Sequence, residues 1–131
     1  RRIVLLAAVD TSPLATQVLT KAAELARRSD GEVIVLHVIR MDDPAGVERL
    51  RHQARRILAE IRYRFVTASG PVPEAIVRTA QDYGVAEIVI GKRGHRPVEE
   101  VLVGSVFQAV LESSAMPVVV VEAELASPPI H

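Results

Sequence analysis

Cysteine is absent from this chain of 131 residues. The sequence therefore cannot form disulfides, a thiolate metal site or a cysteine nucleophile. Aromatic residues make up only 3% of the chain although 49% of it is hydrophobic, so the core must be built from Val, Ile, Leu and Ala. That composition is typical of a parallel sheet covered by helices.

An excess of charge of either sign is also lacking, because 16 Lys and Arg balance 16 Asp and Glu. This balance argues against general nucleic-acid binding and against strong attraction to a membrane surface. Neither a signal peptide nor an apolar run long enough to cross a bilayer is visible, which predicts a cytoplasmic protein. The chain begins Arg1-Arg2 rather than with Met, which leaves open that it is a piece of a longer protein.

Apolar runs that indicate buried strands alternate along the chain with stretches of helical spacing. The expected strands cover residues 3–9, 32–38, part of 63–68, 87–90 and 118–121. The expected helices begin at Ser12-Pro13, at Asp43-Pro44, near Pro73 and near Val103. Such alternation predicts one α/β domain, over residues 1–124, with a parallel sheet and right-handed crossovers. Residues 125–131 are expected to be a tail.

The join between the second helix and the third strand is unusual. Apolar residues continue at helical spacing from Val47 to Ile61, and no Gly, Pro or Asn separates Ile61 from Phe65. Two explanations stay open. Either residues are missing from the sequence here, or the helix ends earlier than its pattern suggests.

A spaced glycine motif lies between the fourth strand and the last helix: Gly91-Lys92-Arg93-Gly94, nine residues, then Gly104-Ser105. Glycines there let the backbone approach a bound group, and free N–H groups at a helix start favour phosphate. The motif therefore predicts a nucleotide site. The alternative is a tight connection that needs glycine for backbone reasons alone.

Two further features lie beside this motif. Lys92, Arg93, His95 and Arg96 form a basic run, which suits either a solvated loop or the neutralisation of phosphate, with Arg93 the leading candidate. Asp10 follows the first strand and suits either a helix cap or a ligand contact. In an open parallel sheet, ligands bind beyond the carboxyl ends of the strands where the strand order reverses. If the first and fourth strands are neighbours, both loops face one crevice.

Four segments together carry a resemblance to a known family. They are Val9-Asp10-Thr11-Ser12-Pro13, Leu36-His37-Val38, the glycine motif, and Pro117-Val118-Val119-Val120-Val121. With them the chain resembles the universal stress protein family over nearly its whole length. The resemblance implies a five-stranded parallel sheet of order 3-2-1-4-5 with helices on both faces. It also implies binding of ATP or another adenine nucleotide.

The resemblance further implies the roles of particular residues. Ala8 and Val9 would line the adenine slot, and the backbone of Val38 would bond to adenine. Asp10 would lie near the ribose and phosphates and help to hold a magnesium or manganese ion. The phosphate side would be formed by Gly91, Arg93, Gly94, His95, Gly104, Ser105 and Val106. The chain departs from the family pattern at Pro97, Glu99, Glu100 and Phe107.

The strand at 118–121 suits either a buried edge or a dimer seam. Because family members commonly pair this strand, the resemblance favours a homodimer through Val118 to Val121.

Three functions follow from these observations. The leading one is an adenine-nucleotide-binding stress-response or regulatory protein with little or no turnover. The second is an interaction module that docks on a membrane transporter or signalling partner, and the third is a weak ATPase that depends on Asp10 and a metal ion. No G-x-S-x-G elbow and no P-loop is present, so no catalytic residue is predicted.

Overall fold

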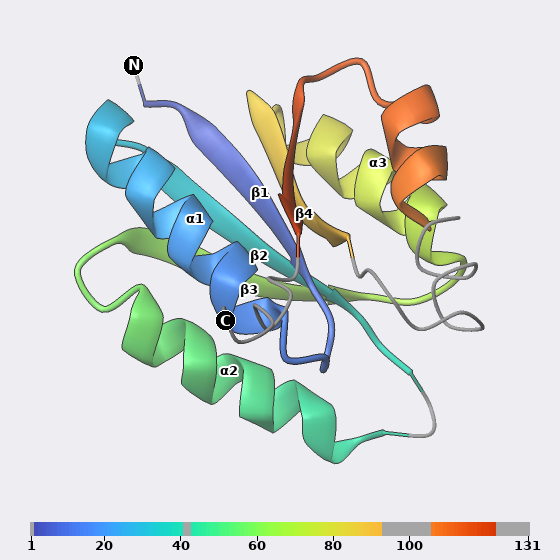
Figure 1. The fold of residues 1–131 in the computed structure, drawn as a ribbon, viewed down its shortest axis with the longest axis horizontal. Coiled ribbons are helices and arrows are strands. Elements are labelled where there is room, and N and C mark those ends of the chain that lie inside the picture. The colour runs from blue at the N-terminus through green and yellow to red at the C-terminus, as the bar shows by residue number, and fades with distance from the viewer. Residues whose placement is uncertain (1, 41–42, 93–105, 123–131) are drawn as a thin grey trace, which may run out of the picture.

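The computed structural model describes residues 2–40, 43–92 and 106–122. Within them, five strands form one parallel sheet with the order β3-β2-β1-β4-β5, which confirms the predicted fold (Figure 1). The strands are β1 (Val4–Val9), β2 (Glu32–Val38), β3 (Arg62–Ala68), β4 (Glu87–Lys92) and β5 (Val118–Glu122).

Helices cover both faces of the sheet. They are α1 (Ala15–Ser29), α2 (Ala45–Ile57) and α3 (Val72–Tyr83), and residues 106–113 are also helical. Figure 1 shows α1 and α2 on one face, with α3 and the 106–113 helix on the other. Within the described residues, no helix is long and apolar enough to cross a membrane.

The two faces hold separate hydrophobic cores. Leu5, Ala7 and Val9 of β1 pack towards α1 and α2, whereas Leu6 packs towards α3. Successive side chains of a strand point to opposite faces, so a strand covered on both sides reads as a continuous apolar run. This explains why the buried strands were visible in the sequence.

The first helix starts later than the sequence predicted. Ser12 and Pro13 were expected to cap and begin it, but α1 begins at Ala15 and its N-cap residue is Leu14, which makes no side-chain capping bond. Two side-chain bonds intervene: Asp10 Oδ1 accepts the N–H of Ser12 at 2.9 Å, and Ser12 Oγ accepts that of Leu14 at 3.2 Å. Such local side-chain bonds offer the backbone an alternative to the helix.

The join after α2 has a simple explanation, since the helix ends at Ile57, earlier than its apolar pattern suggests. A turn follows, in which Ile61 donates its N–H to the carbonyl of Leu58 at 3.0 Å. Leu58 is buried and Ile61 packs against the same core as α2. The apolar spacing therefore continues past the helix because the turn also packs on the core.

The end of β4 corrects a second prediction. The strand was expected to stop at Ile90 and give way to the glycine loop, but it extends to Lys92. The extension is held by β5, because Gly91 pairs with Val121 and Lys92 with Glu122. The first glycine of the motif is therefore a strand residue.

Candidate functional site

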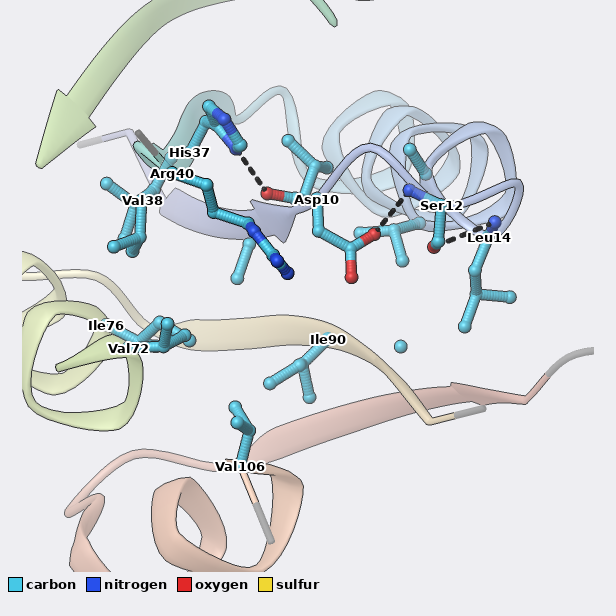
Figure 2. Close-up of a pocket in the computed structure, with 16 residues that line it drawn as sticks. Asp10, Ser12, Leu14, His37, Val38, Arg40, Val72, Ile76, Ile90 and Val106 are labelled. Atoms are coloured by element: carbon cyan, nitrogen blue, oxygen red, sulfur yellow. Dashed lines mark hydrogen bonds between the residues drawn. The ribbon is translucent and has the colours of Figure 1, made fainter. Parts of the chain in front are cut away.

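A cavity of about 500 Å³ lies at the carboxyl ends of β1, β2 and β4 (Figure 2). Its volume falls within the range of roughly 300–1,000 Å³ that is usual for small-molecule sites. The chain leaves β1 for β2 on one side and later returns to β4 on the other side. The cavity therefore occupies the topological switch point, where open α/β sheets bind ligands.

Most of the cavity wall is apolar. Side chains from both faces of the sheet contribute to it, which gives apolar surfaces against which a planar ring can pack. The residues that form these surfaces are Ala8, Val9, Leu14, Ala15, Val18, Leu36, Val38, Val72, Ile76, Ile90 and Val106.

The polar side chains of the cavity come from the end of β2 and from the residues that follow β1 and β2. Asp10 and Ser12 follow β1, and Arg40 follows β2. Figure 2 shows Arg40 extended into the cavity and turned towards the carboxylate of Asp10. The bond from the Ser12 N–H to Oδ1 fixes one side of that carboxylate.

His37 is buried between the ends of β1 and β2, with 2% of its surface exposed. Its Nδ1 lies 3.2 Å from the carbonyl oxygen of Val9. A carbonyl oxygen only accepts hydrogen bonds, so Nδ1 carries the proton and donates it. His37 thus links the two strand ends from which Asp10 and Arg40 emerge.

Gly91 lies where Leu14 and α1 pack on β4. A Cβ at this position would collide with the side chain of Leu14 and lie 3.3 Å from Cγ2 of Val18. The space at Gly91 is therefore filled by Leu14 and by Val18 of α1. Since Gly91 also lines the cavity, it helps to shape the cavity by allowing this approach.

Lys92, the next residue, is directed away from the cavity. Its Nζ lies 4.0 Å from a carboxylate oxygen of Glu122 on β5 and 5.5 Å from the ring centre of Phe107. Lys92 does not line the cavity. Lys92, the first residue of the basic run, therefore contributes to contacts between β4 and β5.

Six of the predicted site residues line this one cavity: Ala8, Val9, Asp10, Val38, Gly91 and Val106. Their roles in binding a ligand stay predictions. The other five lie outside the described residues: Arg93, Gly94, His95, Gly104 and Ser105.

Several cavity residues were missed by the sequence analysis, among them Arg40, Val72 and Ile76. A signal for Arg40 existed, because it is the first charged residue after the apolar run that forms β2. Val72 and Ile76 come from the start of α3, and only the packing of that helix brings them to the cavity.

Among the described residues, the side chains available to bind a divalent metal ion are poorly suited to it. The described residues include no group of three or more His, Cys, Asp or Glu side chains that could hold an ion. One oxygen of Asp10 already accepts a backbone N–H. A metal role for Asp10 stays a prediction that these residues do not support.

The fold and the cavity define a doubly wound α/β domain with a ligand cavity at its switch point. The model of the Universal stress protein family matches residues 3–122. The chain therefore belongs to the universal stress protein family, as the sequence motifs predicted.

Individual relatives agree with this assignment. Universal stress protein A homolog 1 of Coxiella burnetii is 29% identical over 136 residues, which cover 89% of this chain and 94% of the relative. A universal stress protein solved in complex with cAMP has a TM-score of 0.77 at 19% identity, covering 94% of this chain and 98% of its own. One from Archaeoglobus fulgidus, solved in complex with dAMP, has a TM-score of 0.73 at 24% identity, covering 92% and 97%.

Proposed function

We propose that this protein binds an adenine nucleotide in the switch-point cavity and acts as a regulatory protein with little or no turnover. The observation that carries the proposal is the cavity itself, with apolar walls and polar groups that come from the strand ends. Support also comes from two solved members of the family, which hold cAMP and dAMP.

The chemistry of the lining residues suits the parts of such a ligand. Val38, Val72 and Ile76 offer apolar surface to a purine ring. The carboxylate of Asp10 accepts hydrogen bonds and suits ribose hydroxyl groups. The glycine motif supplies the phosphate side in this proposal, through backbone N–H groups at Gly104 and Ser105.

We propose little turnover because the described part of the cavity offers few groups for acid–base catalysis. Asp10 is the only Asp or Glu among the described cavity residues, and the Ser12 N–H occupies one of its oxygens. A general base must be within reach of the proton it removes and free to accept it. Weak ATP hydrolysis is the competing hypothesis. It would be favoured if the wild-type protein released phosphate from ATP faster than an Asp10→Asn variant.

The proposal includes a homodimer formed through β5. This strand is an edge of the sheet, and Val120 is 37% exposed there. An exposed apolar edge strand offers unpaired backbone groups to a second copy. A transporter or signalling protein as partner stays an alternative occupant of this edge.

Mass spectrometry of small molecules that co-purify with the protein tests the function first. Calorimetric titration of the stripped protein with AMP, ADP, ATP and cAMP follows, with GMP as the control for base selectivity. We expect saturable binding of at least one adenine nucleotide and weaker binding of GMP. Folded protein that binds none of these ligands would contradict the proposal.

A further inference from the structure

The cavity contains two full charges of opposite sign. Apart from the imidazole of His37, which donates to a backbone carbonyl, Asp10 and Arg40 are the cavity's only acidic and basic side chains among the described residues. Figure 2 shows the guanidinium of Arg40 turned towards the carboxylate of Asp10 across the cavity. The described lining is therefore close to neutral, although it includes a carboxylate where a phosphorylated ligand would bind.

Arg40 emerges from backbone that is held on both sides. Before it, Ile39 donates its N–H to the carbonyl of Ala68 at 2.8 Å, which continues the pairing of β2 with β3. After it, Asp43 donates its N–H to the carbonyl of Arg40 itself at 3.2 Å. The direction in which the side chain leaves the sheet is therefore set by the fold.

The position of Asp10 is set in the same way. The Ser12 N–H fixes Oδ1 at 2.9 Å, and the carbonyl of Val9, the preceding residue, is bonded to His37. A carboxylate and a guanidinium held on neighbouring strand ends form a preorganised arrangement, since neither backbone must be reordered when a ligand binds.

A divalent ion would compete poorly at this position. Magnesium requires near-ideal octahedral oxygen coordination and gives up water reluctantly. Asp10 offers one carboxylate with an oxygen already engaged, and no second acidic side chain lines the described part of the cavity. Arg40 keeps its charge at all ordinary pH values, and it would repel a dication brought to Asp10.

We propose that Arg40 supplies the positive charge beside Asp10, so that an adenine nucleotide binds in this cavity without a divalent metal ion. The inference rests on the proposed function. It assigns to Arg40 a role in binding that the family motifs do not include, and it replaces the metal role predicted for Asp10. Arg40 offsets the carboxylate and donates hydrogen bonds to an anionic ligand group.

The test compares AMP and adenosine, with and without metal. Calorimetry of the wild-type protein is run with EDTA and with millimolar magnesium; AMP is chosen because it chelates magnesium only weakly. The expected AMP affinities in the two buffers agree within about twofold, a difference well below 1.4 kcal/mol.

Arg40→Gln is expected to weaken AMP binding in EDTA by about tenfold or more, since a charge-assisted bond is lost. Adenosine, which lacks the phosphate, is expected to be affected less.

Two variants serve as controls. Arg40→Lys keeps the charge and is expected to retain most of the AMP affinity. Arg78→Gln removes an exposed arginine of α3 that does not line this cavity, and it is expected to leave the affinity unchanged. Thermal unfolding of each variant shows that its fold is intact.

Three results would overturn the inference. The first is AMP binding by the wild type that needs magnesium and loses this dependence in Asp10→Asn. The second is unchanged AMP binding in folded Arg40→Gln. The third is binding of Mn²⁺ alone to the wild-type protein, detected as enhanced water relaxation, that is abolished by Asp10→Asn. Failure of every adenine ligand in both buffers would instead remove the proposed function, so the two failures are distinguishable.

Discussion

Gly91 and Leu14 pack against each other so closely that no Cβ fits between them. A Cβ at Gly91 would lie 2.9 Å from Cγ of Leu14 and closer still to one of its methyl groups. Leu14 is buried directly before α1, and Gly91 lies in β4. The first glycine of the sequence motif thus sets the distance between α1 and β4 at the rim of the cavity.

Gly91→Ala is therefore expected to destabilise the protein by about 1–3 kcal/mol, the usual cost of overpacking a filled core. Urea unfolding of the variant measures this loss. The reason is steric, so Leu14→Ala should relieve it. In the Gly91→Ala/Leu14→Ala double variant we expect the two losses to be clearly less than additive. Strictly additive losses would show that the contact does not explain the need for glycine.

His37→Phe is expected to lower the free energy of unfolding by about 1–3 kcal/mol, because the buried bond to the Val9 carbonyl is lost. The matched control is His52→Phe, which changes an exposed residue of α2 and is expected to stay within about 0.5 kcal/mol of the wild type. Chemical denaturation compares the two. Equal effects would contradict the structural role of His37.

The residues that end α1 and α3 differ in how well they suit a left-handed backbone conformation. Asp30 ends α1 with φ of 52°, whereas Gly84 ends α3 with φ of 60°. Glycine adopts this conformation without strain, so Asp30→Gly is expected to stabilise the protein by a few tenths to about 1 kcal/mol. Gly84→Ala is expected to cost about 1 kcal/mol, although a Cβ there meets nothing within 4 Å. Thermal unfolding that shows the same sign for both variants would contradict this account.

The proposed dimer predicts that Val120→Arg produces monomers, because a charge on an edge strand opposes pairing with another strand. Sedimentation velocity of the variant and the wild type checks this. Thr67→Arg is the matched control, since it places the same charge on an exposed position of β3, the opposite edge. A wild-type monomer, or equal effects of both variants, would count against the β5 interface.

The sequence was sufficient to locate the strands because buried strands are covered on both faces, whereas the strand order followed from the resemblance to the family. Such strands read as long apolar runs, as at β1 and β2, and they were located to within a residue or two. The boundaries that were wrong or left open depend on contacts that a pattern does not contain. The start of α1 depends on the bonds of Asp10 and Ser12, and the end of α2 on a turn whose Leu58 is still buried.

The candidate site was only partly predictable for a similar reason. Asp10 directly follows one apolar run and Val38 ends another. Their place at strand ends could therefore be inferred. The contribution of Ile76 depends on how α3 packs across the sheet, and the direction of Arg40 depends on the turn after β2. The ligand role expected of Gly91 stays a prediction, and the contact of Gly91 with Leu14 could not be inferred from the sequence.

The most direct test of the central claim is calorimetric titration of Ala8→Leu with AMP, beside the wild type. Ala8 lies on β1 and lines the cavity, so a larger side chain there takes up ligand space. Ala45→Leu, on the exposed start of α2, adds the same atoms away from the cavity. The account predicts AMP binding by the wild type and Ala45→Leu, and affinity weakened about tenfold or more, at least ~1.4 kcal/mol, in folded Ala8→Leu. Equal affinity for AMP in all three proteins would show that the nucleotide does not bind in this cavity.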